Sequence, residues 1–398
     1  NMATFRFKNP DVKMMAAEDD FEMGGHKFRA GSIIIPGGDR AKLDSALKTL
    51  GLSAWTTSSE PSVKTHELVI PRIGYIHSWT RTQDEGWWRA ALDTYGIPYT
   101  YFADQKLKEG NLRAKYDVII FPHVGGTPVS EVNGMPVTGK DPLPYEKTAD
   151  TPNLAYLDSS EDIRGGMGLQ GLLELAKFVD EGGTLITEGS TATIFPEFGL
   201  TSGVTVEHPE ELFVRGSILR GRFTDKKSPI AYGFEDTDIP VYFNQDPVLN
   251  VTAGGGFGGR GGGGGGRGGG GAINAGEGQN ITPNAEPVHI SPWENDEADM
   301  KTSQMARPAE DDLAALRQAA RQFGINLDES RPRVIMRFPA NPADMLLSGT
   351  LANGQFLANR AAVVDASLGK GHVVMFALRP FWRWQTQGTY SLGFNTIM

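Results

Sequence analysis

Three polar residues have the types needed for nucleophilic catalysis. Ser190 follows an expected buried strand at a sharp turn, and His208 and Glu210 form a His-x-Glu pair further along the chain. A hydroxyl activated by a histidine, which is oriented by a carboxylate, can attack an acyl group. However, the Gly-x-Ser-x-Gly pattern is absent from the sequence, and Ser190 would serve equally well as a helix N-cap. The sequence therefore leaves a serine nucleophile and a structural serine both open.

A zinc site is the second chemistry to consider. His208 and Glu211 form the single His-x-x-Glu of the sequence, and the next histidines are His289 and His372. A catalytic zinc ion needs three close protein ligands and one open position, and nothing marks either later histidine as the third ligand. We expect neither a metal nor another cofactor in this chain.

Two short stretches could bind a ligand at the end of a strand. Asp84, Glu85 and Trp87 follow the first strand of the expected sheet, and Gly125 and Gly126 follow the third. Ligand loops of doubly wound sheets lie at the carboxyl ends of the strands. Carboxylates beside an indole could hold a cation or a sugar. The alternative is structural, because acidic residues in the first turn of a helix interact favourably with its dipole.

The segment Arg-Pro-Phe-Trp-Arg-Trp at 379–384 could bind a partner. Trp382, Arg383 and Trp384 alternate aromatic and cationic side chains, a composition suited to cation–π contacts. The same residues could instead pack on the edge of the domain.

The pattern between residues 72 and 122 indicates the fold. Residues 73–76 form a short apolar run typical of a buried strand, and apolar side chains recur at helical spacing over 84–95. Thr82 is expected to cap this helix, with Glu85 completing a capping box. Further segments of the expected domain are strands at 99–102, 118–121 and 184–187, a helix at 169–180, antiparallel strands at 212–223 and 241–243, a hairpin over 360–378 and a final helix from Gly388 or Thr389.

Together these segments predict an α/β fold. We expect a three-layer, doubly wound, flavodoxin-like and mostly parallel sheet with an antiparallel extension. The expected divisions are a small α/β unit at 1–70 and one large domain at 71–398, with an insertion at about 252–310. The small unit should hold strands at 4–7, 12–16 and 32–35 and a helix at 40–50.

Residues 254–271 contain 15 glycines in 18 positions. A segment of this composition buries too little apolar surface to order itself, so a flexible linker is the plain interpretation. A second hypothesis is that the tract packs against a neighbouring subunit and produces a homo-oligomer. Because the chain begins with Asn1 before Met2 and ends in mid-pattern, we also expect it to be a piece of a longer protein.

Composition excludes several classes of protein. The formal net charge is −10, which argues against nucleic acid as a general partner, since such proteins carry clustered positive charge. No apolar run is long enough for a membrane span. With no cysteine, disulfides and cysteine nucleophiles are excluded.

Several motifs in shared order resemble the region that follows the catalytic domain in bacterial carboxypeptidase A-like zinc metallopeptidases. That region carries a class I glutamine amidotransferase-like domain without obvious catalytic residues. The motifs are Ala-Gly-Ser at 30–32, Arg-Ile-Gly-Tyr at 72–75, Asp-Glu-Gly-Trp at 84–87, Tyr-Asp-Val-Ile-Ile at 116–120, Glu-Gly-Gly-Thr-Leu at 181–185, Gly-Lys-Gly-His-Val-Val at 369–374 and Arg-Pro-Phe-Trp-Arg-Trp-Gln at 379–385.

This resemblance implies a non-catalytic accessory or assembly module. The zinc ligands and the general base of the family belong to a peptidase domain that would precede residue 1, and no position here carries them over. The resemblance therefore implies zinc in the parent protein, an upstream or separate zinc peptidase domain as partner, and a periplasmic or secreted location. The alternatives are a serine hydrolase on the amidotransferase-like fold and a structural protein that self-assembles through the glycine tract.

Overall fold

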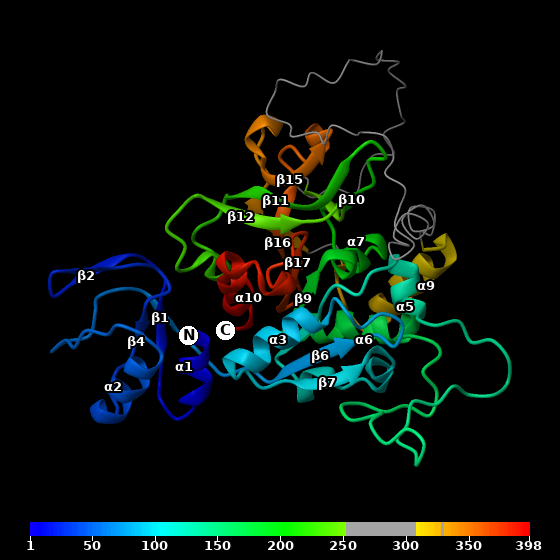
Figure 1. The fold of residues 1–398 in the computed structure, drawn as a ribbon, viewed down its shortest axis with the longest axis horizontal. Coiled ribbons are helices and arrows are strands. Elements are labelled where there is room, and N and C mark those ends of the chain that lie inside the picture. The colour runs from blue at the N-terminus through cyan, green and yellow to red at the C-terminus, as the bar shows by residue number, and fades with distance from the viewer. Residues whose placement is uncertain (252–307, 328–329) are drawn as a thin grey trace.

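The computed structural model describes residues 1–251, 308–327 and 330–398. A twelve-stranded mixed sheet lies at its centre (Figure 1). The main path of this sheet runs through β12 (Asp238–Phe243), β11 (Phe213–Phe223), β14 (Arg331–Arg337), β16 (Ala361–Leu368), β17 (Gly371–Phe376), β9 (Thr184–Glu188), β8 (Val118–Phe121), β6 (Ile73–His77) and β7 (Thr100–Ala103). Three further strands join it at the side: β10 (Val204–Glu207), β13 (Val248–Val251) and β15 (Leu346–Ala352).

The sheet has a parallel half and an antiparallel half. Strands β7, β6, β8, β9 and β17 run parallel to one another, whereas β16, β14, β11 and β12 pair antiparallel. Strand β17 is the junction, because it pairs parallel with β9 and antiparallel with β16. The predicted fold class is confirmed: an α/β protein with a doubly wound parallel sheet and an antiparallel extension.

Helices cover both faces of the parallel half. Right-handed crossovers place the helix after β6 and the helix after β8 on opposite faces. This is why every residue of β6 and β8 is buried and why both strands are apolar almost throughout. The helices are α3 (Gly86–Tyr95), α4 (Leu112–Lys115), α5 (Pro128–Asn133), α6 (Gly168–Asp180), α7 (Ile194–Glu197), α9 (Glu310–Gln322) and α10 (Tyr390–Ile397). Helix α6 contacts α4, α5 and α9, and α3 meets α10 through Tyr95 and Phe394.

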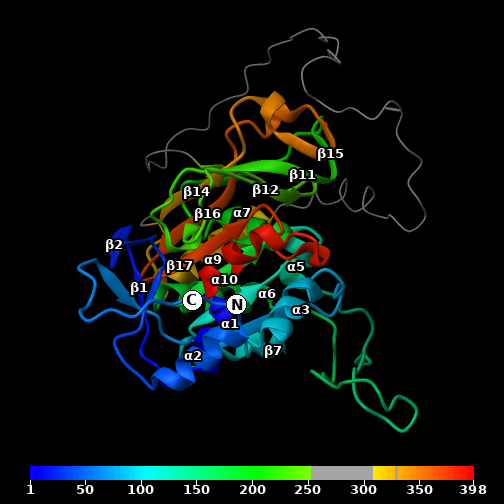
Figure 2. The same cartoon turned by 60° about the vertical axis from the view of Figure 1, so that its left-hand side comes forward.

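The N-terminal unit has a sheet and a core of its own, and Figure 2 shows it beside α10. Its elements are α1 (Met2–Lys8), β1 (Met15–Ala17), β2 (Phe21–Met23), β3 (His26–Phe28), β4 (Ile33–Ile34), α2 (Arg40–Thr49) and β5 (Thr65–Glu67). The prediction of a strand at 4–7 was wrong, because these residues form helix α1. Tertiary contacts decide this: Phe5 is fully buried and the Arg6 guanidinium donates to the carbonyls of Leu68 and Asn9.

The predicted capping box of α3 was also wrong. The helix begins at Gly86, and Glu85 makes no side-chain cap. Instead the Glu85 carboxylate accepts a hydrogen bond from the Tyr101 hydroxyl at 2.8 Å. Glu85 is 1 % exposed, so its side chain points into the sheet rather than back to Thr82.

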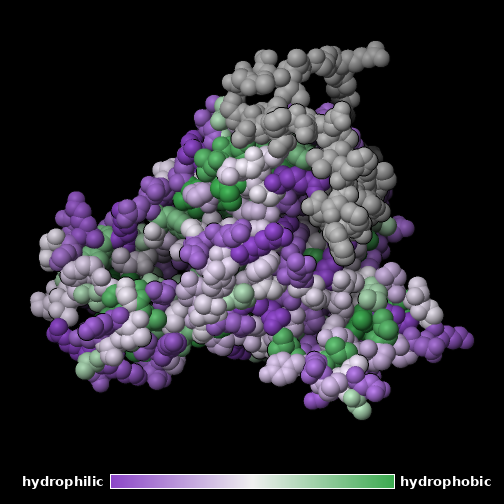
Figure 3. All heavy atoms as spheres, viewed as in Figure 1, coloured by the Kyte–Doolittle hydropathy of each residue, from purple (hydrophilic) through white to green (hydrophobic). Residues whose placement is uncertain are grey.

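Apolar side chains are distributed in small groups over the molecular face shown in Figure 3, which is mainly hydrophilic. Single exposed apolar residues are ordinary on protein surfaces. The glycine tract at 254–271 and most of the predicted insertion at 252–310 lie outside the described residues. Both hypotheses about the tract therefore remain predictions.

Candidate functional site

A cavity of about 830 Å³ opens at the carboxyl edge of the parallel half of the sheet. Four of its lining residues each follow a different parallel strand: Asp84 follows β6, His123 follows β8, Ser190 follows β9 and Arg379 follows β17. Because the carboxyl ends of parallel strands meet at one edge, residues far apart in sequence converge there. This is the edge at which open α/β sheets bind their ligands.

The buried side chain of His123 contacts two of the other three residues through its ring nitrogens. Its Nδ1 atom accepts the backbone N–H of Ser190 at 2.9 Å, and its Nε2 atom lies 2.9 Å from Nη2 of Arg379. Gly189 makes this approach possible, since a Cβ atom there would lie 2.5 Å from Nδ1 and its φ is +56°. Burial, with the guanidinium groups of Arg379 and Arg81, lowers the pKa of His123 well below its usual range. The imidazole is therefore neutral at pH 7.

Arginines and one indole form another part of the cavity lining, next to His123. Arg379 is 5 % exposed, and its guanidinium lies 4.5 Å from the centre of the Trp382 ring. The Arg383 guanidinium lies 5.1 Å from the same ring, and Tyr242 stacks on that ring at 5.0 Å. Asp84 faces this group, with its Oδ2 atom 3.7 Å from Nη1 of Arg379. Trp382 thus holds two guanidinium groups at one cavity wall.

Two buried carboxyl groups lie behind the cavity lining. Burial raises the pKa of Glu188 to about 7, although Arg379 opposes the shift. Its Oε2 atom accepts the Trp88 indole N–H at 2.6 Å. Burial raises the pKa of Glu131 to about 8. The neighbouring Ser190 side chain lowers this pKa, but its effect is smaller than that of burial. Within the part of the chain that the structure describes, neither oxygen of Glu131 accepts a hydrogen bond.

The structure does not bring the three candidate nucleophilic residues together. His208 lies on the surface, where its Nε2 atom is 3.4 Å from Oε1 of Glu197, and Glu210 is exposed. Ser190 lies in the cavity wall, and its Oγ atom accepts the backbone N–H of Gly125 at 2.9 Å. The imidazole nearest to Ser190 is that of His123, which binds its backbone N–H and not its hydroxyl.

The candidate ligand-binding residues divide into two groups. The cavity lining includes five of them: Asp84, Gly125, Gly126, Trp382 and Arg383. The other three do not line it. Glu85 is bonded to Tyr101, Trp87 packs edge-on against Trp382 at 6.3 Å, and Trp384 packs against Tyr390.

Sequence reasoning missed His123, Glu131 and Glu188 as site residues. The signal for His123 was present, because it stands between the third predicted strand and the Gly125-Gly126 turn. Glu188 likewise follows a predicted strand and stands two positions before Ser190. No sequence pattern marks Glu131. It lies beside the cavity because α5, which contains it, packs there.

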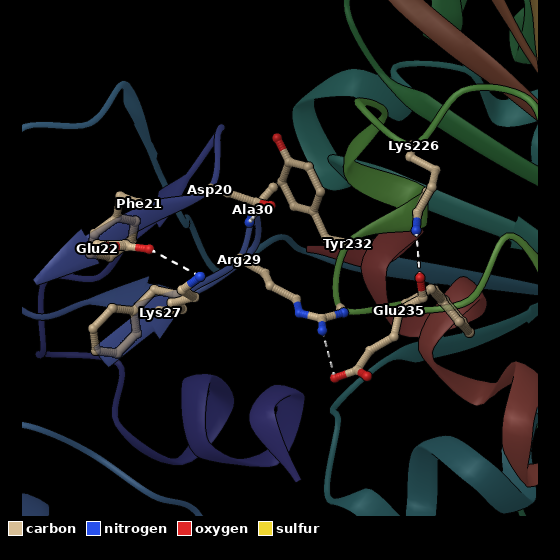
Figure 4. A pocket seen from close by; sticks show the side chains of 13 residues that line it. Asp20, Phe21, Glu22, Lys27, Arg29, Ala30, Lys226, Tyr232 and Glu235 are labelled. Atoms are coloured by element: carbon tan, nitrogen blue, oxygen red, sulfur yellow. Dashed lines mark hydrogen bonds and ion pairs between the residues drawn. The ribbon is translucent and has the colours of Figure 1, made fainter. Parts of the chain in front are cut away.

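A second cavity, of about 730 Å³, lies between the β2–β3 hairpin and residues 226–235 (Figure 4). Its charged side chains are paired across or beside it. Lys27 lies 3.3 Å from Glu22, and Arg29 lies 2.9 Å from Glu235. Because these charges compensate one another, this cavity has less preference for a charged ligand than the one at the sheet edge.

Two kinds of feature are absent from the described residues. Among residues 1–251, 308–327 and 330–398, no group of three or more histidine, aspartate or glutamate side chains is placed to hold a metal ion. In the same ranges, no helix is long and apolar enough to cross a membrane.

No protein-family model matches the sequence, and no curated protein matches it. Solved structures with a similar fold include a candidate GMP synthase component from Thermoplasma acidophilum, with a TM-score of 0.38, 8% identity and coverage of 82% of this chain and 92% of that one. PurLQS from Thermotoga maritima has a TM-score of 0.37 and 12% identity, with coverage of 83% of this chain and 98% of that one. A ThuA-like protein from Bacteroides uniformis has a TM-score of 0.35 and 8% identity, with coverage of 82% of this chain and 89% of that one. At these values the similarity concerns the fold alone and carries no argument about activity.

Proposed function

We propose that this chain is a non-catalytic accessory or assembly module of a zinc carboxypeptidase-like protein. The observation that carries the non-catalytic part is the hydrogen bonding of Ser190. Its hydroxyl oxygen accepts the N–H of Gly125, and the adjacent imidazole accepts the N–H of Ser190 itself. A serine nucleophile needs a base that takes the proton from its hydroxyl. His123 is already engaged with a backbone donor, and His208 lies on the surface beside Glu197.

The parent protein is inferred from the order of the sequence motifs. The Gly-Gly at 182–183 and the Gly-Lys-Gly at 369–371 meet in the structure, where β9 and β17 pair. A Cβ atom on Gly371 would overlap with the carbonyl oxygens of Gly183 and Val179. These glycines therefore serve strand packing, which supports a structural rather than a catalytic reason for the motifs. The zinc peptidase partner and a periplasmic or secreted location are part of the same proposal.

The alternative is a hydrolase that uses Ser190. One observation favours it: Ser190 lines the cavity beside the buried Glu131, whose carboxyl group could act as a base once it ionises at a pH above about 8. A base must lie within hydrogen-bond reach of the proton that it removes. The Ser190 hydroxyl lies near enough to Glu131 to lower the pKa of that carboxyl group, although neither Glu131 oxygen meets a hydrogen-bond partner at ordinary geometry among the described residues.

Substitution of Ser190 separates these two functions. We expect Ser190→Ala to leave hydrolysis of a panel of chromogenic esters and peptides at the wild-type level. The same variant should lose about 1 kcal/mol of stability, because the N–H of Gly125 loses its acceptor. Exposed Ser59→Ala is the matched control for both measurements. Wild-type hydrolysis that disappears in Ser190→Ala alone would contradict the non-catalytic proposal.

The parent protein is tested by zinc content and intact mass of material purified from its natural source. We expect zinc to accompany a species larger than the 43.1 kDa of this chain. About one zinc ion per chain at 43.1 kDa would instead place a metal site within this chain. A zinc-free species of that mass with no associated peptidase would count against the proposed partner.

A further inference from the structure

The cavity at the sheet edge carries more positive than negative side chains. Four arginines line it, and the carboxylates of two aspartates oppose them. The arginines are Arg81, Arg215, Arg379 and Arg383, and the aspartates are Asp84 and Asp246. A cleft lined by an excess of one charge concentrates ligands of the opposite charge. The cavity is therefore suited to an anion.

The contacts of His123 bring two N–H donors to an imidazole that, when neutral, can accept only one of them. Both ring nitrogens face N–H groups, from Ser190 at Nδ1 and from Arg379 at Nε2. A neutral imidazole accepts at one nitrogen and donates from the other. When Nδ1 accepts from Ser190, the ring proton is on Nε2. The Oδ2 atom of Asp84 lies 3.6 Å from this Nε2 atom. The N–H of Arg379 that faces Nε2 then needs another acceptor, which a bound anion can supply.

Arg383 adds a second guanidinium that is positioned by the backbone. Arg383 and Trp384 have φ values of +47° and +62°, which cost energy for residues other than glycine. The turn is held by two hydrogen bonds to the carbonyl of Pro380, from the hydroxyls of Thr386 at 2.6 Å and Thr389 at 2.7 Å. The effect is that Arg383 lies against Trp382 and lines the cavity. No ion pair joins Arg383 to an acidic residue among the described ranges.

We propose that Arg379 and Arg383, both held against Trp382, bind the oxyanion group of a small anionic ligand, a carboxylate or a phosphate. The planar guanidinium group donates two parallel hydrogen bonds to either of these groups. Stacking on an indole restricts the two side chains before the ligand arrives, so less conformational entropy is lost on binding. This site goes beyond the accessory role proposed above and does not depend on it.

Calorimetric titration tests the site with two probes, inorganic phosphate and succinate, at constant ionic strength and pH 7. We expect at least one of them to bind wild-type protein at about one site per chain. Binding of phosphate alone would indicate a phosphorylated ligand, and binding of succinate alone a carboxylate ligand. Failure of both probes to bind would overturn the proposal, while leaving the non-catalytic role of Ser190 untouched.

Variants of Arg383 distinguish the site from general surface charge. Arg383→Gln should weaken binding by about tenfold or more, because hydrogen bonds to charged groups contribute roughly 1.5–3 kcal/mol each. Arg383→Lys should recover part of the affinity, since it keeps the charge but loses the planar fork. Arg40→Gln is the control, since Arg40 is exposed in α2 and does not line the cavity. Equal affinities for wild type, Arg383→Gln and Arg40→Gln would refute the site.

Discussion

Replacement of Trp88 by alanine is expected to lower the free energy of unfolding by about 3–5 kcal/mol, the cost of removing a large buried aromatic side chain. Trp88 is 1 % exposed, and its ring packs edge-on against Phe381 with centroids 4.6 Å apart. The indole therefore joins α3 to the segment that follows β17. Its N–H also donates to Glu188 behind the cavity. Loss of the ring removes both the packing and the hydrogen bond.

Two further variants separate these contributions in urea denaturation. Trp88→Phe retains most of the packing but removes the N–H donor, which leaves the buried Glu188 oxygen without its partner. We therefore expect the free energy of unfolding to fall by about 1–3 kcal/mol. Trp55→Ala is the control, because Trp55 is 50 % exposed and its loss should cost less than about 1 kcal/mol. A Trp88→Ala variant as stable as Trp55→Ala would show that the indole does not join these elements as described.

Replacement of Glu131 by glutamine is expected to change how stability depends on pH. The pKa of Glu131 is about 8 in the folded chain, against an ordinary value of 4.5. Between these two pH values the folded state binds more protons than the unfolded state, so the contribution of Glu131 to stability falls as pH rises. Above pH 8 both states are ionised and the contribution becomes constant. Glutamine has no proton to lose and should abolish this fall.

The effect should be measured by chemical denaturation at about pH 5, 6, 7 and 8. The variant should gain stability relative to wild type across this range, on the order of 3 kcal/mol in total, since one unit of pKa shift corresponds to about 1.4 kcal/mol. The slope that remains between about pH 5 and 7 is assigned to the two other buried carboxyl groups, Glu188 and Asp104, whose pKa values are each about 7. Exposed Glu60→Gln is the control and should follow wild type. Parallel curves for wild type and Glu131→Gln would contradict the assignment.

Local pattern was sufficient for many regular elements of the large domain, but not for α5, α7, β10, β13 and β15, which it did not predict. The apolar run at 118–121 corresponds to β8, and the amphipathic segment at 169–180 corresponds to α6, which begins one residue earlier. Both signals come from side-chain burial, which is continuous along β8 and periodic along α6, and short-range sequence records both patterns directly. The same reasoning failed at 4–7, because Arg6 is placed by a contact with Leu68, which lies 62 positions away in the sequence.

The candidate site was predicted in part. Asp84, Gly125 and Arg383 were identified because strand ends and unusual aromatic–cationic runs are visible in one stretch of sequence. That Ser190 meets His123, and not His208, could not be predicted, because it depends on the pairing of β8 with β9.

The sequence by itself determined the main strand and helix segments of the parallel half of the sheet, the α/β class and the residues that stand at strand ends. The tertiary structure alone decided which of these residues share a cavity and in what state of charge. The reason is physical. Segment formation depends on side chains a few positions apart, whereas the pKa of Glu131 and the arrangement of Arg379 beside His123 depend on burial created by strands distant in sequence.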